Sequence, residues 1–262
     1  METAARRDFI THDFSHNYMR RLIAIIVFLL SIPALMPMSA GPAASPSSAM
    51  GPLRVHPGNP RYFMDGSGKP VYLTGSHTHI NFKDWGYTDP PAIFDYAAYL
   101  AFLKQHNHNF MRLWTWDQTQ WVRYSDSLHK DATVYVTPFP WVRVGPGTAG
   151  DGKPKFELNQ FDQAYFNRLR QRTMDAATRG IYVSIMLFEG NAPASVPAAV
   201  VGSPFSANNN VNGIHVDQNG DGKATEAYTL EIPGITVIQD AYVRKVIDTV
   251  NDLDNVLYEN LQ

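Results

Sequence analysis

The chain has 262 residues, of which 44% are hydrophobic and 18% are charged, and its formal net charge is −2. This length allows one large domain or two small ones with a sizeable core. The nearly neutral charge, with neither a basic stripe nor an acidic tail, argues against a nucleic-acid partner and favours a neutral or small one. The sequence has no cysteine, which excludes disulfides and thiolate metal sites.

The N-terminal region has the pattern of a secretory signal peptide. Two arginines follow Met19, and about fourteen mostly apolar residues and a small-residue stretch come next. A membrane span needs about twenty apolar residues, so an uncleaved anchor is the alternative rather than the prediction. We therefore predict a start at Met19 and a secreted or periplasmic product that is free of the membrane after cleavage. The cleavage sites, in order of preference, are Ala40, Ala44 and Ala49.

The rest of the chain alternates apolar runs of strand length with amphipathic stretches. After a signal-bearing extension (1–40) and a Pro/Ser/Ala-rich linker (41–52), we predict one domain (53–262). Its first expected elements are a β-hairpin around the turn D-G-S-G, a strand ending at Gly75, a helix opened by Asp89 and a strand over 109–116. A helix from Asn159 to Gly180 and a strand over 181–188 come next. The last expected elements are a helix containing 243–250 and a strand over 255–259.

The order of these elements predicts the fold class. Continuous apolar strands separated by helices imply a parallel sheet covered by helices. Long loops follow the strands, as in folds whose active site lies at the carboxyl ends of the strands. No phosphate-binding glycine loop follows the first strand, which argues against a nucleotide-binding fold. We therefore predict the first half of a (β/α)8 TIM barrel, with about four parallel strands and three helices after the hairpin.

Arg112 is the most informative residue of the predicted strands. It lies within N-F-M-R-L-W-T-W-D (109–117), where an unpaired charge would cost several kcal/mol. Because side chains alternate along a strand, Arg112, Trp114 and Trp116 share one face. We expect an acidic partner for Arg112, either in a structural ion pair or in a functional site.

Aromatic residues and histidines gather near the ends of the first two predicted strands. Four of the five tryptophans lie in or just after 109–116, and planar rings of this kind stack on the apolar faces of sugars or pack loops. The pair His77 and His79 has three readings, namely a zinc site, a contact to sugar hydroxyls or a structural role. The sequence leaves these readings open.

Several pieces resemble the N-terminal half of secreted glycoside hydrolases of clan A, closest to the cellulase-type family 5. They are D-G-S-G-K-P-V-Y-L-T-G-S-H, Y-L-A-F-L-K-Q-H-N-H-N-F-M-R-L-W-T-W, G-I-Y-V-S-I-M-L-F-E-G and D-N-V-L-Y-E, which together span Leu53 to Glu259. The resemblance implies hydrolysis of O-glycosidic bonds in a polysaccharide or oligosaccharide, with no required cofactor. It also implies that Arg112 supports the nucleophile and that a histidine such as His77 or His79 contacts substrate hydroxyls. Independently of the resemblance, the rings of Trp114 and Trp116 suit sugar stacking, and Glu189 and Asn191, at the end of the third strand, are candidates for substrate contacts. For Glu189, a hydrogen bond that stabilises its loop is an equal alternative.

The resemblance also concerns what the chain lacks. Retaining glycosidases need two carboxylates about 5 Å apart. In such relatives the acid/base follows an Asn at the end of the fourth strand, whereas here Glu259 is followed by three residues. We therefore expect both catalytic carboxylates beyond Gln262, Arg112 without its partner, and a truncated chain that is inactive alone. A non-catalytic carbohydrate-binding fragment and, less favoured, a zinc amidohydrolase are the alternatives.

A second candidate site follows the opening of a calcium loop. Asp217, Asn219 and Asp221, followed by Gly222, match D-x-N-x-D-G, but position twelve is Tyr228 instead of the usual glutamate. The segment is therefore either a structural calcium site, with another glutamate as ligand, or a plain turn.

Overall fold

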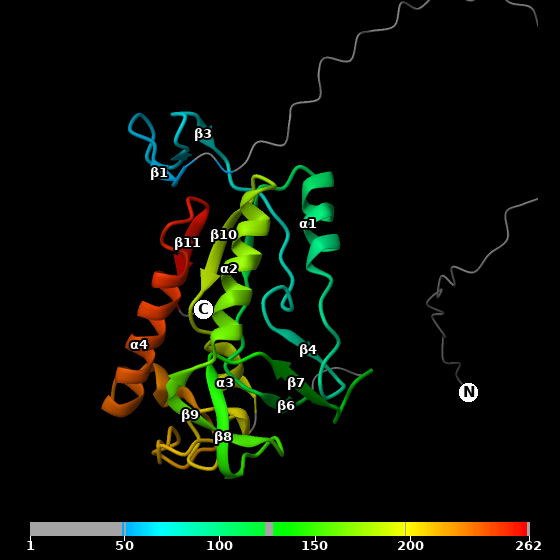
Figure 1. Cartoon of the computed structure of the whole chain (residues 1–262), viewed down its shortest axis with the longest axis vertical. Coiled ribbons are helices and arrows are strands. Elements are labelled where there is room, and N and C mark those ends of the chain that lie inside the picture. Colours follow the sequence, from blue (N-terminus) through cyan, green and yellow to red (C-terminus); the bar gives the residue numbers. More distant parts are fainter. Residues whose placement is uncertain (1–48, 50, 124–127, 197, 261–262) are drawn as a thin grey trace, which may run out of the picture. The chain divides into compact units, whose positions relative to one another are not determined.

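The computed structural model describes residues 49, 51–123, 128–196 and 198–260, all of which belong to the compact unit Ala44–Gln262 (Figure 1). The predicted signal peptide, with Met19, Ala40 and Ala44, lies outside the described residues. Within the described part of the chain, no helix is both long and apolar enough to cross a membrane.

A three-stranded parallel sheet lies at the centre of this unit. Its strands are β5 (Phe110–Leu113), β10 (Tyr182–Met186) and β11 (Val256–Glu259), in the order β11-β10-β5. Val183 lies opposite Met111 on one side and Val256 on the other. All five residues of β10 are buried, as expected of a central parallel strand.

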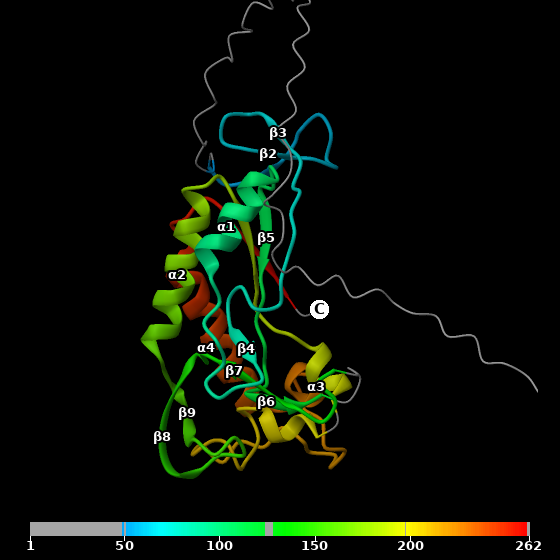
Figure 2. The ribbon, with the colours of Figure 1, turned by 90° about the vertical axis from the view of Figure 1, so that its right-hand side faces the viewer.

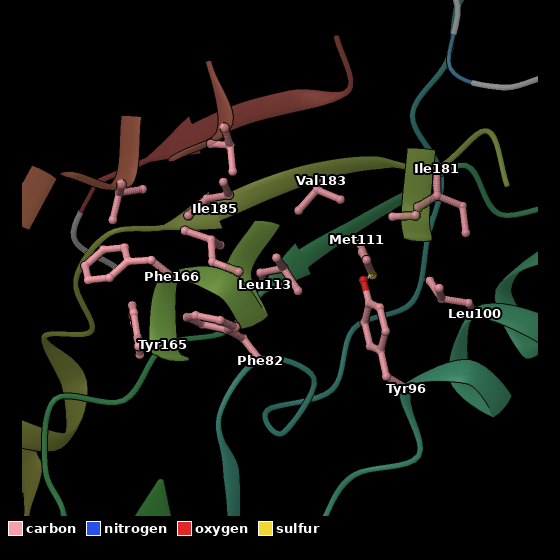
Figure 3. Close-up of a cluster of buried hydrophobic side chains, with 14 of the residues drawn as sticks. Phe82, Tyr96, Leu100, Met111, Leu113, Tyr165, Phe166, Ile181, Val183 and Ile185 are labelled. Atoms are coloured by element: carbon pink, nitrogen blue, oxygen red, sulfur yellow. Dashed lines mark hydrogen bonds between the residues drawn. The ribbon is translucent and has the colours of Figure 1, made fainter. Parts of the chain in front are cut away.

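Three helices, α1 (Tyr96–Gln105), α2 (Gln163–Ala177) and α4 (Pro233–Val250), cover one face of this sheet (Figures 1 and 2). The first two begin with capping aspartates, since Asp95 accepts from the backbone of Ala98 and Asp162 from that of Ala164. Figure 3 shows the apolar core between helices and sheet, with the side chains of Met111, Leu113, Val183 and Ile185 on the strand side.

The remaining strands form three antiparallel sheets. They are β1-β2-β3 (Arg54–Val55, Phe63–Met64 and Pro70–Val71), β4-β7-β6 (Asp84–Gly86, Thr133–Thr137 and Gln120–Val122) and β8-β9 (Trp141–Thr148 and Pro154–Phe161). Short helices α3 (Asn191–Ser195), η1 (Ala199–Gly202) and η2 (Thr225–Tyr228) complete the unit. A second apolar core joins β7, β8 and β9 to residues 200–238.

The predicted half of a TIM barrel is wrong. Only three of the four expected strands form the parallel sheet, and most strands of the described chain lie in antiparallel sheets. The first expected strand is absent from that sheet, because Val71 pairs within the hairpin sheet and Gly75 makes only an isolated bridge to Phe110. Four strands, β6 to β9, also occupy the region expected to be one long loop.

The other expected elements exist, with shifted ends. The hairpin around D-G-S-G is confirmed, since β2 pairs with β3 antiparallel. Asp89 does not open α1, whose cap is Asp95, and Asn159 lies in β9 rather than at the start of α2. In both cases a later aspartate accepts the helix amide, so it sets the start of the helix.

Candidate functional site

Arg112 has the acidic partner that its position demands. Its Nε donates to Glu259 Oε1 at 2.6 Å, and the two side chains are 18% and 28% exposed. The ion pair joins β5 to β11 across β10, where Ser184 lies level with Arg112. The expected acidic partner of Arg112 is therefore confirmed as Glu259, which reaches back along the same face of the sheet, while support of a catalytic nucleophile by Arg112 stays a prediction.

The four predicted aromatic contacts lie together beside this ion pair. The rings of His77 and Trp114 are stacked, with centroids 5.8 Å apart, and His79 lies 4.4 Å from Trp114. Trp116 meets the ring of His79 edge-on at 6.0 Å and donates its indole N–H to the His79 carbonyl at 2.6 Å. The Arg112 guanidinium lies 4.9 Å from the Trp114 ring, which connects the aromatic group to the ion pair.

The exposure of these residues leaves the histidines open to a ligand. His77 and His79 are exposed, Trp116 is partly buried and Trp114 is 7% exposed. Burial, with smaller contributions from His77 and Arg112, lowers the pKa of His79, so its ring is more often neutral than that of a free histidine. A shallow pocket of about 70 Å³ lies between His77 and Arg112.

Next to this group, Asp117 ties three segments together. Its Oδ2 accepts from the Tyr228 hydroxyl at 2.6 Å and from the Glu189 backbone at 2.8 Å. Burial is the main cause that raises the pKa of Asp117, against the opposing effect of Lys83. These hydrogen bonds hold the ends of β5 and β10 and the short helix η2 in fixed relation.

Glu189 makes the loop-stabilising hydrogen bonds that the sequence allowed. Its carboxylate accepts from the backbone of Asn191 at 2.9 Å and of Ala192 at 3.1 Å, at the start of α3. Burial, followed by the charge of Asp117, raises the pKa of Glu189 to about 7. The Asn191 side chain is exposed and accepts from the Ser195 hydroxyl. A substrate contact by Glu189 or Asn191 stays a prediction.

Lys83 is a buried cation that the sequence reasoning missed. The residue is 2% exposed, and its Nζ donates to the Trp116 carbonyl at 2.5 Å and lies 3.9 Å from the centre of the Phe139 ring. Burial lowers the pKa of Lys83 to about 7, although Asp117 acts in the opposite direction. The signal available in the sequence was a single lysine that follows Phe82 in I-N-F-K-D-W.

The loop with the calcium pattern is closed by its own backbone. Asp217 accepts from the amides of Asp221 and Gly222, and Asn219 also accepts from Asp221. Glu226 turns toward the same loop and accepts from the Asn219 amide at 3.3 Å. Within the described residues, no group of three or more His, Cys, Asp or Glu side chains, this loop included, is arranged to hold a metal ion, and calcium binding stays a prediction.

The zinc alternative finds no support in the residues that the structure describes. Within them, no group of three or more His, Cys, Asp or Glu side chains could hold a metal ion. His77 and His79 are close, with ring centroids 5.7 Å apart, but a zinc site needs at least three protein ligands.

The comparisons with known proteins are sparse. No family model matches the sequence, and no curated protein matches it significantly. Among solved structures, the chain is similar to a protein of Bacteroides vulgatus ATCC 8482 that is provisionally named a glycoside hydrolase, with a TM-score of 0.45 and 14% identity over 83% of this chain. The chain spans 32% of the length of that protein. A likeness this distant carries no argument, and the resemblance to clan A or family 5 stays a prediction.

Proposed function

We propose that the chain binds carbohydrate at the group formed by His77, His79, Trp114 and Trp116, as part of an enzyme that hydrolyses O-glycosidic bonds. The observation that carries this proposal is the arrangement itself, in which four aromatic and imidazole rings lie beside the Arg112–Glu259 ion pair.

The chemistry of a sugar fits such a group. Indole rings offer apolar faces to the C–H side of a pyranose, while imidazole nitrogens and a guanidinium bind its hydroxyls. The low pKa of His79 leaves a ring nitrogen that accepts a hydrogen bond from a hydroxyl near neutral pH. The role of this chain is then to bind and orient the sugar.

Hydrolysis needs carboxyl groups in addition to the sugar-binding rings. Retaining and inverting enzymes both use a pair of carboxyl groups on either side of the scissile bond. At this face Glu259 is engaged by Arg112, while Asp117 and Glu189 accept backbone amides. We therefore expect binding by this chain without turnover. A non-catalytic carbohydrate-binding role is the second candidate, favoured by the same observation.

Binding is tested on a panel of soluble polysaccharides by affinity electrophoresis. Loss of one stacking ring costs about 0.5–1.5 kcal/mol, so Trp116→Ala is expected to weaken binding by about two- to tenfold. Tyr72→Ala is the matched control, because Tyr72 is exposed and belongs to the hairpin region. Equal affinities of the two variants would contradict the proposed site.

Turnover is tested on aryl glycosides with the same preparations. Activity that Glu259→Gln abolishes would show that Glu259 acts in the reaction, and it would overturn the assignment of Glu259 to a supporting ion pair. If the wild-type chain and Glu259→Gln both bind carbohydrate and neither shows activity, the result agrees with the proposal.

A further inference from the structure

Lys83 lies in the wall of a small, partly enclosed chamber that the proposed carbohydrate site does not use. The chamber has a volume of about 20 Å³ and is walled by aromatic rings, among them those of Phe139, Trp141 and Tyr165, with Asp117 also in its lining. It lies beside the carboxyl end of β5, which leads directly to Thr115 and Asp117. A charged residue placed in such an apolar space is costly unless it is fully paired.

The pairing of Lys83 is incomplete. A protonated amine has three N–H groups to donate, and the Trp116 carbonyl accepts one of them. The Phe139 ring lies on another side of Nζ. Within the described residues no carboxylate lies within 4.0 Å of this nitrogen, and Asp117, in the same lining, acts on it only from a greater distance, so burial shifts the amine toward its neutral form with a free lone pair. The pKa of about 7 agrees with this geometry.

Other polar groups of the chamber are suited to a carbonyl compound. The indole N–H of Trp141 is buried and has no hydrogen-bond partner within the described part of the chain. The hydroxyls of Tyr165 and Tyr242 are 3.1 Å apart, and the Tyr228 hydroxyl donates to Asp117 at 2.6 Å. The lining of the chamber thus includes a tryptophan whose N–H is unpaired and tyrosines whose hydroxyls can pass a proton.

The chamber adjoins an open groove. Phe188, Tyr228 and Gln239 line both the chamber and a surface groove of about 360 Å³, whose outer wall includes Leu230 and Val243. These three side chains therefore lie between the groove and the chamber, and the groove is the side from which a small molecule would approach the amine.

We propose that Lys83 is a nucleophile that takes up a short aldehyde in this chamber as an imine. The Nζ lone pair forms the C–N bond while the carbonyl electrons move to oxygen, and a proton passes from Nζ to that oxygen to give a carbinolamine. The carbinolamine then loses its hydroxyl group, with a proton from nitrogen, as water when the C=N bond forms. The step needs no oxidant or reductant, and a desolvated lysine in an apolar pocket is the usual setting for it. The small volume limits the ligand to an aldehyde of very few atoms.

The test uses the folded wild-type chain with formaldehyde and cyanoborohydride, which traps the imine as a methylated amine. Peptide mapping by mass spectrometry after short exposures at pH 7 compares Lys83 with the seven other lysines of the sequence. At this pH an ordinary lysine is neutral in well under 1% of molecules, so Lys83 is expected to react at least about tenfold faster than the exposed Lys130 and Lys223. Benzaldehyde is the size control, and it should label the exposed lysines but spare Lys83.

Two results would overturn the proposal. The first is a Lys83 that stays unmodified in the folded chain and reacts only in denaturing urea, because it would then be a sealed structural lysine. The second is equal labelling of Lys83 by formaldehyde and benzaldehyde, which would show that the chamber does not select the ligand. Neither result depends on carbohydrate binding at the proposed site.

Discussion

Replacement of Lys83 by methionine should change the stability of the protein in a pH-dependent way. The pKa of Lys83 falls from 10.5 to about 7 because the residue is buried. At pH 6 the folded state must hold the charged form, which costs about 5 kcal/mol relative to a lysine in water. As the pH rises from 7 toward 10.5, the folded state binds fewer protons than the unfolded state, so this cost declines, to about 2 kcal/mol at pH 9.

Methionine keeps the length of the side chain and removes the charge. It also leaves the Trp116 carbonyl without its donor, a loss of about 1–3 kcal/mol that does not depend on pH. The variant is therefore expected to be more stable than wild type by a few kcal/mol at pH 6 and close to it at pH 9. The difference between the two conditions, about 3 kcal/mol, reports the titration of Lys83 together with its electrostatic coupling to Asp117.

Urea unfolding at both pH values measures this difference. Lys104→Met serves as the control, because Lys104 is exposed on α1 and its removal should have the same small effect at pH 6 and pH 9. An equal change in stability at the two pH values for Lys83→Met would refute the reasoning, since it would mean that the amine titrates as an ordinary lysine or has a charged partner.

Three further predictions follow from other contacts. In a double-mutant cycle, Arg112→Met and Glu259→Gln should show a coupling of about 1–2 kcal/mol, and additivity in urea unfolding would contradict the ion pair. Asp84→Ala should lower the free energy of unfolding by about 3–5 kcal/mol, because the Asp84 side chain is 4% exposed and accepts two N–H groups from the guanidinium of Arg168 on α2. Asp240→Ala, at an exposed ion pair, should lower it by less than about 0.5 kcal/mol. Similar losses in the two variants would refute this difference. If the predicted calcium loop binds metal, titration calorimetry with calcium should give heat that Asp221→Ala removes, and the absence of heat in wild type would exclude the site.

The parallel sheet could be predicted from the sequence because its strands are continuous apolar runs. I-Y-V-S-I-M gave β10 within two residues, and the spacing of Val246 and Val250 placed α4. The first expected strand failed for a visible reason, since the V-Y-L-T-G run places Tyr72 74% exposed and ends at a glycine that Phe110 approaches closely. Apolar composition alone did not show which run would be buried.

The long loop after β5 was misjudged although its pattern was present. T-V-Y-V-T alternates in the manner of a half-buried strand, and Val134 and Val136 are indeed buried in β7. The run has only five residues, and so short an alternation does not by itself distinguish a strand from an extended loop. The position of Asp117 between β5, β10 and η2 could not be predicted, because its partners Tyr228 and Glu189 lie 111 and 72 residues away.

Arg112 and Lys83 are two cations near the carboxyl end of β5, and the fold accommodates them in different ways. Arg112 was recognised in the sequence because it interrupts a strand, and the fold compensates it with a carboxylate at 2.6 Å. Lys83 directly precedes β4 and interrupts no predicted strand, yet it is the more deeply buried of the two. A carbonyl and aromatic rings contact its amine, and the charge of Asp117 acts on it from farther away. The Arg112 charge is held by a carboxylate in contact, whereas burial shifts Lys83 toward the neutral amine, the form that can act as a nucleophile. Of the two cations, Lys83 is therefore the one whose presence calls for a chemical role.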